Sequence, residues 1–130
     1  VGFRNDAHCT STGKLLLASL PPHVLEATLN GWRLKQHTPH TIVRIDKLRA
    51  ELSDIRKNGW AENNNESEMG VASVAAPVRN GMGEVIAAVS VAGPVQRLTG
   101  DSLRRFARPC IEAGVAISRR LGYHEKPKGR

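Results

Sequence analysis

The first half of the chain carries apolar residues at helical spacing. Three hydroxyl residues precede an apolar run, which predicts a short helix over about residues 12–19. Pro22 can begin a second helix that ends near Asn30 and Gly31, because proline is tolerated at the first helical position. A third helix is predicted from Asp46, as its cap, to Gly59, because apolar residues follow at i, i+4 and i+7: Leu48, Leu52 and Ile55.

From residue 60 onward the pattern changes from helical spacing to β-type runs. Residues 60–62 form a predicted short strand, and residues 63–68 form a polar loop. Two runs of small and β-branched residues, 71–78 and 85–92, are separated by six residues that include Asn80 and Gly81. Asn-Gly between two such runs is a strong hairpin signal, so the sequence predicts an antiparallel hairpin.

The last helix has the longest apolar stripe. Thr99 is its expected cap, Asp101 lies in its first turn, where negative charge suits the helix dipole, and Gly122 ends it. Its predicted apolar positions are 103, 106, 107, 110, 111, 115, 117 and 121. Helices on both sides of an antiparallel hairpin, without βαβ alternation, predict an α+β fold.

Each strand of the predicted hairpin has one face of small residues. Because side chains alternate along a strand, Ser73 and Ala75 share one face of the first run, and Ser90 and Ala92 share one face of the second. Small side chains with hydroxyls suit the wall of a cavity, since a close-packed core needs bulk. The alternative is that both serines lie on a solvent face or bond to backbone groups, and the pattern leaves this open.

The turn from Thr10 to Gly13 is a second candidate for ligand binding. A helix start exposes unpaired backbone N–H groups and the positive end of the dipole, and Gly13 lets a ligand or a strand approach closely. If it faces the small residues of the sheet, this turn would accept the anionic group of a small carboxylate or phenol. The alternative is a plain capping turn.

Positive charge is concentrated near the C-terminal end. The 130 residues have a formal net charge of +7, and residues 97–130 contribute nine basic and three acidic side chains. Such a run is typical of a solvated helix face, and direct contact with nucleic acid through the Arg-rich helix is the alternative. Phe106 is the one aromatic residue among these arginines, so no stacking platform for single strands is indicated. No apolar stretch approaches the roughly 18 residues of a membrane helix, so no membrane span is expected.

The two cysteines lie far apart and form no CxxC motif, which predicts reduced thiols. A thiol–imidazole pair of Cys9 with His8, or of Cys110 with a histidine, would be needed for covalent catalysis, but buried cysteines are usually inert. His8, Cys9, His37 and His40 could gather around zinc, although no spacing requires it. We assign no catalytic residue, no metal ligand and no cofactor, and whether a metal binds near His8 and Cys9 stays open.

Short motifs follow one another along nearly the whole chain. They are AHCTSTGKLLLA (7–18), TPHT (38–41), LRAEL (48–52), IRKNGWA (55–61), Glu66, GVASVAAPV (70–78), AAVSVAGP (87–94), RLT (97–99) and LG (121–122). In this order and spacing they resemble the C-terminal effector-binding domain of IclR-type (isocitrate lyase regulator) bacterial transcription factors.

The resemblance implies a GAF-like antiparallel sheet with helices packed on it, and a ligand sensor in place of an enzyme. It implies that residues 1–123 form the effector-binding domain, incomplete at its N-terminus, and that 124–130 is a basic, disordered tail. The chain starts without Met, and the first strands of the domain and the winged helix-turn-helix are expected to be missing. The implied partners are a small-molecule effector, further copies in a homodimer or homotetramer, and promoter DNA through the absent domain, in a cytoplasmic protein.

The resemblance also implies where the effector binds. The family's pocket positions correspond here to Ser11, Thr12, Gly13, Asn63, Val71, Ser73, Ser90 and Ala92. Asn63 stands where a carboxylate can occur and Ala92 where a second serine can occur, which favours a carboxylate ligand with an apolar portion. The effector's identity, the operator and the direction of regulation are not determined by the sequence.

Overall fold

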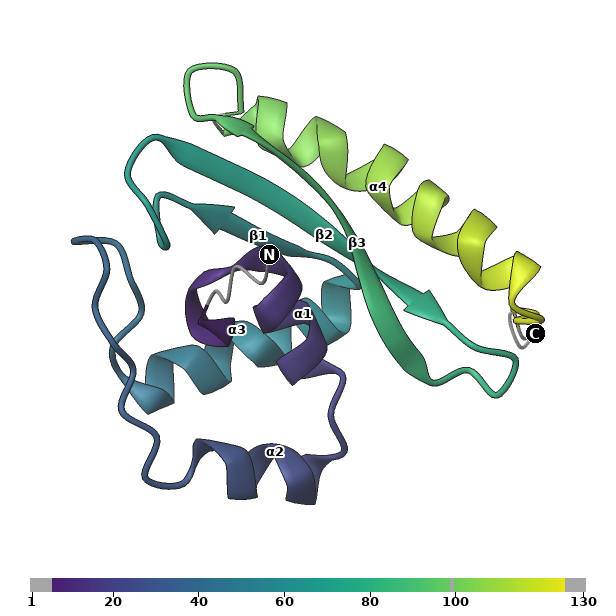
Figure 1. Cartoon of the computed structure of the whole chain (residues 1–130), viewed down its shortest axis with the longest axis horizontal. Coiled ribbons are helices and arrows are strands. Elements are labelled where there is room, and N and C mark those ends of the chain that lie inside the picture. The colour runs from purple at the N-terminus through teal and green to yellow at the C-terminus, as the bar shows by residue number, and fades with distance from the viewer. Residues whose placement is uncertain (1–5, 99, 126–130) are drawn as a thin grey trace, which may run out of the picture.

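The computed structural model describes residues 6–98 and 100–125, and it contains a three-stranded antiparallel sheet with helices on both faces (Figure 1). This architecture confirms the α+β prediction. Within the described residues, no helix has the length and apolar character needed to cross a membrane. The elements in chain order are η1 (Ala7–Cys9), α1 (Ser11–Ala18), α2 (Pro22–Leu29), α3 (Ile45–Asn58), β1 (Ala61–Asn64), β2 (Val71–Arg79), β3 (Val85–Pro94) and α4 (Asp101–Arg120).

Local signals set the start of the first two helices, and α1 begins one residue before the predicted position 12. Thr10 caps α1, because its Oγ1 accepts the backbone N–H of Gly13 at 3.1 Å. Pro22 is the first residue of α2, where a missing N–H removes no intrahelical hydrogen bond. Both helices are eight residues long, so they depend on packing for their stability.

The third helix begins two residues earlier than predicted, because its cap is Arg44 and not Asp46. It starts at Ile45, so the prediction that Asp46 caps it was wrong. The Asp46 carboxylate lies in the first turn and accepts two hydrogen bonds, at 3.0 and 3.1 Å, from the guanidinium of Arg44. Gly59 ends the helix with a φ of 81°, in the left-handed region that glycine adopts without strain.

The strand order is β1-β2-β3, with both pairings antiparallel. The hairpin around Asn80 and Gly81 joins β2 to β3 as predicted. β1 extends to Asn64, two residues into the predicted polar loop, because Asn63 pairs with Ser73 and Asn64 with Ala72. This pairing satisfies backbone groups that a loop would leave to solvent.

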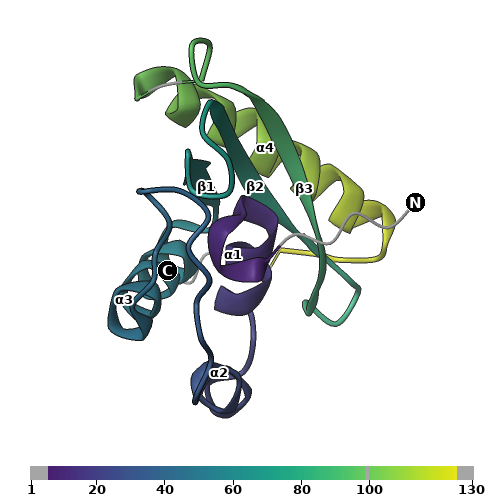
Figure 2. The same cartoon turned by 60° about the vertical axis from the view of Figure 1, so that its left-hand side comes forward.

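Helices cover the two faces of the sheet separately. α4 runs along one face, whereas α1 and α3 lie on the other side (Figures 1 and 2). Alternate residues of β2 therefore enter two different cores: Ala72, Val74 and Ala76 pack against α4, and Ala75 packs against α1 and α3. β2 is the central strand and is covered on both faces.

The buried stripe of α4 is narrower than predicted. Phe106 and Ile117 are each 41% exposed, and Leu121 is 47% exposed, because only one side of the helix meets the sheet. A Cβ at Gly114 would lie 2.5 Å from the carbonyl oxygen of Pro77, so α4 approaches the β2 backbone closely there. Thr99, the predicted cap, and residues 126–130 of the predicted tail lie outside the described residues. The buried positions are Leu103, Ala107, Cys110, Gly114 and Ser118.

Candidate functional site

The first turn of α1 contacts the small-residue face of β2. A hydrogen bond of 2.7 Å joins the hydroxyls of Ser11 and Ser73, and both side chains are buried. The close approach predicted at Gly13 is made by η1, because a Cβ at Gly13 would overlap the backbone of Ala7. Of the three N–H groups in this turn, that of Gly13 is already bonded to Thr10. The structure therefore brings two of the predicted pocket elements together.

Five of the predicted residues lie on one face of the sheet. The register pairs Asn63 with Ser73 and Ser73 with Ala92, so these three residues form a row across the strands. Val71 and Ser90 lie on the same face, two residues away along their strands. This is the face on which α1 packs.

The two small-residue strands have different surroundings. On β2, α1 covers Ser73 and Ala75, which are 7% and 0% exposed. On β3, at the edge of the described sheet, Ser90 and Ala92 are exposed, and the half-buried Val71 lies next to this strand. The close approach of α1 thus accounts for the small residues of β2, whereas on β3 the same face is open.

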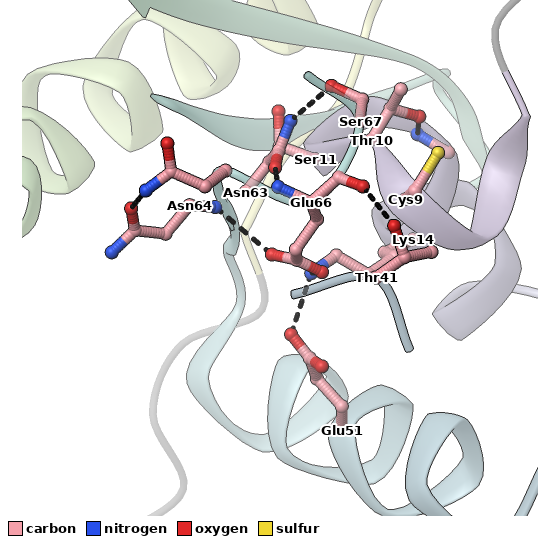
Figure 3. Close-up of polar contacts among 12 residues, drawn as sticks. Cys9, Thr10, Ser11, Lys14, Thr41, Glu51, Asn63, Asn64, Glu66 and Ser67 are labelled. Atoms are coloured by element: carbon pink, nitrogen blue, oxygen red, sulfur yellow. Dashed lines mark hydrogen bonds and ion pairs between the residues drawn. The ribbon is translucent and has the colours of Figure 1, made fainter. Parts of the chain in front are cut away.

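Asn63 shapes the loop that follows β1. Its Oδ1 accepts the backbone N–H of Glu66 at 2.9 Å, and its Nδ2 donates to the hydroxyl of Ser67 at 3.0 Å (Figure 3). The side chain is buried, and both of its polar ends are engaged in the loop. Asn63 thereby fixes the backbone beside Ser73 and the α1 turn.

Beside this row lies an ionic cluster that the pattern did not predict. Lys14 is fully buried, and its ammonium donates to Glu51 at 2.7 Å and to Glu66 at 2.8 Å (Figure 3). Burial raises the pKa of Glu66, and the charge of Lys14 opposes this shift. The signal for this cluster is a lysine within the apolar run of α1, since a buried ammonium requires carboxylate partners.

Two threonines of the TPHT motif hold the same loop from outside. Thr41 donates its hydroxyl to the carbonyl of Glu66 at 2.6 Å, and Thr38 donates to the carbonyl of Asn65. Both threonines are buried. The motif therefore connects the segment before α3 to the loop after β1, and it fixes the position of Glu66.

A groove opens at the other end of α1. It has a volume of about 470 Å³ and lies between α1, the end of α3 and the β2–β3 hairpin. Leu15, Ile55, Pro77 and Val85 contribute to its lining. None of the eight predicted effector-binding residues lines this groove.

The cysteines lack the properties of a catalytic nucleophile. Burial raises the pKa of the thiols of Cys9 and Cys110 above their ordinary value, which disfavours the thiolate that catalysis needs. At η1, the side chains of His8, Cys9 and His37 each place one atom that could bind a metal ion, a ring nitrogen or the sulfur, within 4.8 Å of the other two. His40, the fourth residue considered for zinc, lies outside this group.

The arginines of α4 lie on its outer, solvent side. Three of them have acidic partners: Arg104 with Asp101, Arg108 with Glu112, and Arg119 with Glu125. All of these side chains are exposed, so each ion pair is weak. The pairs reduce the positive charge that this face presents.

Comparison with known proteins places these features in one family. The model for "Bacterial transcriptional regulator IclR C-terminal" matches residues 1–119. The regulator XynR of Escherichia coli is 37% identical over 123 residues, which are 95% of this chain and 49% of XynR. KdgR of Dickeya chrysanthemi is 34% identical over 98% of this chain and 42% of its own length, so the chain spans about half of such relatives or less.

Solved structures agree with this assignment. The C-terminal domain of E. coli KdgR superimposes with a TM-score of 0.86 at 32% identity, over 95% of this chain and 75% of that one. A double mutant of the inducer-binding domain of PobR from Acinetobacter, in complex with 3-hydroxybenzoic acid, gives a TM-score of 0.82 at 30% identity, over 94% of this chain and 68% of that one. These relatives are transcriptional regulators, not enzymes. The chain belongs to the IclR family of bacterial transcriptional regulators, whose C-terminal regulatory domain it contains.

Proposed function

We propose that this domain senses a small organic acid and thereby modulates operator binding by a winged helix-turn-helix in the full-length, cytoplasmic regulator. The observation that carries the proposal is the buried Ser11–Ser73 hydrogen bond, which joins the start of α1 to the small-residue face of the sheet. A ligand bound beside this contact would meet a helix start and a row of small residues at once.

The proposed site extends from this contact toward β3. The ligand's carboxylate would accept hydrogen bonds from the N–H groups of Ser11 and Thr12, since that of Gly13 is bonded to Thr10, and from the hydroxyls of Ser73 and Ser90. Its apolar portion would lie against Val71 and Ala92, which share this face. Thr12 and Gly13 would complete the turn, and Asn63 would hold the loop beside it. The complex of a double mutant of the PobR inducer-binding domain with 3-hydroxybenzoic acid supports an acid of this class.

Effector binding would act through the arrangement of subunits. A ligand shifts an equilibrium only by its differential affinity for two states, so the proposed effector must bind one arrangement of the homodimer or homotetramer more tightly. Exposed apolar side chains on the described surface support association, including Ile86, Phe106 and Ile117. Light scattering after size exclusion, with and without ligand, measures the assembly directly.

The test is a thermal-shift screen against small carboxylic and aromatic acids, followed by calorimetry on hits. A ligand at about 100 times its Kd stabilises the folded state by about 2.7 kcal/mol, which raises Tm by roughly 10 °C in a domain of this size. Ser90→Leu fills the proposed site and should abolish binding without unfolding the domain. Ala87→Leu is the matched control, because Ala87 is also exposed on β3 but lies on the opposite face. Unchanged affinity in Ser90→Leu would refute the assignment.

A further inference from the structure

The groove at the C-terminal end of α1 has the size of a small-molecule site. Its volume of about 470 Å³ lies within the range of about 300–1,000 Å³ that is typical of ligand pockets. Three parts of the chain that are distant in sequence form its walls: the end of α1, the end of α3 and the β2–β3 hairpin. The site proposed above lies at the start of α1 and shares no lining residue with this groove, so the two are separate.

Apolar side chains from all three walls line the groove. They are Leu15 and Leu20 from α1 and the segment after it, Ile55 from α3, and Pro77 and Val85 from the hairpin strands. Leu15 and Ile55 are buried, whereas Pro77 and Val85 are half-buried. A ligand with an apolar body would cover the exposed parts of these side chains, which is favourable because apolar surface leaves water.

Two guanidinium groups border the same groove, and backbone carbonyls hold both of them in place. Arg56 donates from Nε to the carbonyl oxygen of Ala18 at 3.0 Å, and from Nη2 to that of Leu20 at 2.6 Å. Arg79 donates from Nη1 to the carbonyl oxygen of Gly83 at 2.9 Å. A guanidinium has five N–H donors, so each group keeps donors for a further acceptor. Within the described residues, neither arginine forms an ion pair with an Asp or Glu side chain.

We propose that this groove is a second binding site, which takes an organic monoanion with an aromatic or branched apolar body. The ligand's carboxylate would accept hydrogen bonds from the remaining N–H groups of Arg56 and Arg79, because a planar guanidinium matches the geometry of a carboxylate. The apolar body would lie against Leu15, Ile55 and Val85. Since carbonyl oxygens already hold both arginines, little side-chain freedom is lost on binding.

One acidic side chain of the groove acts against an anion. Glu84 is exposed, lines the groove, and forms an ion pair with neither arginine. Two guanidinium groups against one carboxylate leave a net charge of +1 among the lining residues, which favours an anionic ligand. Because like charges repel, Glu84 should weaken binding of an anion while Arg79 strengthens it. The two residues therefore provide tests of opposite sign.

The alternative is that both arginines only support the fold and that the groove holds solvent. Arg56 satisfies carbonyl oxygens at the end of α1, which have no partner within that helix, and Arg79 links the two ends of the hairpin turn. A purely structural role predicts that changes at Arg79 alter stability. It predicts no saturable binding of a carboxylate in the groove.

The experiment is a titration of the ¹⁵N-labelled 130-residue chain with 2-naphthoate, followed by amide correlation spectra. We expect saturable shifts at the amides of groove residues, including Leu15, Gly59, Gly83 and Val85. The uncharged analogue 2-naphthol should bind about 10-fold more weakly or less, because it lacks the carboxylate that the arginines recognise. The absence of saturable shifts at these amides, or equal binding of 2-naphthol, would overturn the proposal.

Variants test the charges of the groove and separate it from the site at the start of α1. Arg79→Gln should weaken binding of 2-naphthoate about 10-fold or more, and Glu84→Gln should strengthen it about 2- to 5-fold. Arg105→Gln is the matched control, because Arg105 is exposed on α4 outside the groove, and it should bind as the parent does. Ser90→Leu should leave the groove shifts unchanged, so failure of one site is distinguishable from failure of the other. Glu84 is exposed, so its variant stays informative if Arg79→Gln does not fold; a Glu84→Gln chain that binds no more tightly than the parent would refute the site.

Discussion

Removal of the buried ammonium of Lys14 should destabilise the domain more than removal of any lysine on its surface. Lys14→Met keeps most of the apolar stem, but it leaves Glu66 buried without its cation, while Glu51, whose side chain is 30% exposed, can turn to solvent. The remaining hydrogen bond to the Glu66 carboxylate comes from the backbone N–H of Asn64 at 3.1 Å. This single donor does not replace an ammonium at 2.8 Å.

The size of the effect follows from the geometry. At an effective dielectric constant of about 20, each of the two contacts of Lys14 corresponds to about 6 kcal/mol of Coulomb energy, which is largely offset by several kcal/mol of desolvation for each ion. Breaking one side of a buried pair costs about 3–5 kcal/mol in measured cases. With a urea m-value of about 2 kcal/mol per M, the unfolding midpoint should fall by roughly 2 M.

Urea unfolding followed by far-ultraviolet circular dichroism provides the measurement. Lys47→Met is the matched control, because Lys47 is exposed on α3 and should shift stability by no more than about 0.5 kcal/mol. The double variant Lys14→Met with Glu66→Gln removes both buried charges, while the amide oxygen can still accept the Asn64 N–H. It should therefore be more stable than Lys14→Met alone. A loss below about 1 kcal/mol in Lys14→Met, or no recovery in the double variant, would refute this account of the cluster.

Four further outcomes are expected. Burial raises the pKa of Glu66 above its ordinary 4.5, so the folded state holds that proton more tightly than the unfolded state does. The stability that this proton adds is present below pH 4.5 and is lost as pH rises through the folded-state pKa. The cost of Lys14→Met should therefore shrink when urea unfolding is repeated at lower pH. Gly114→Ala should lower Tm despite the better helix propensity of alanine, because its Cβ would lie 2.5 Å from the carbonyl oxygen of Pro77 in β2. Such overpacking costs about 1–3 kcal/mol, and a rise in Tm would contradict this packing. Ser11→Ala and Ser73→Ala should each lower the free energy of unfolding by about 1–3 kcal/mol, and the double variant should lose less than the sum of the two. A double-mutant cycle measures this coupling, and strict additivity of the two losses would contradict it. The chain alone should bind DNA weakly, without sequence preference and with strong salt dependence in a filter-binding assay; specific binding to one operator would show that the Arg-rich helix reads DNA directly.

The sequence predicted those elements whose signals are local. The hydroxyl cap before α1, the proline at the start of α2 and the Asn-Gly hairpin each depend on residues a few positions apart, and the structure confirms all three, with Thr10 as the capping hydroxyl. The start of α3 was misplaced by two residues because Asp46 bonds to the Arg44 guanidinium, a competing partner that the capping pattern does not reveal.

The candidate site depends on contacts that the sequence pattern alone does not contain. Ser11 and Ser73 are separated by 62 residues, and the buried lysine at position 14 finds its carboxylates 37 and 52 residues later. Periodicity identified the small-residue face correctly, but whether that face is empty or covered depends on how closely α1 approaches. Within the described residues, the Nδ1 of the buried His8 ring has no hydrogen-bond partner, which is visible only once the structure places its Nε2 2.7 Å from the carbonyl oxygen of Lys35.

The double coverage of β2 has a consequence for how such a domain diversifies. Val74 and Ala76 belong to the core under α4, whereas Ser73 and Ala75 belong to the side of α1, so neighbouring residues of one nine-residue strand are constrained by different packing partners. Changes of specificity can accumulate at one set of alternate positions while the other set stays fixed. Under the proposed function, a strand shared in this way would let a lineage acquire a new signal molecule without rebuilding the helix that packs behind it.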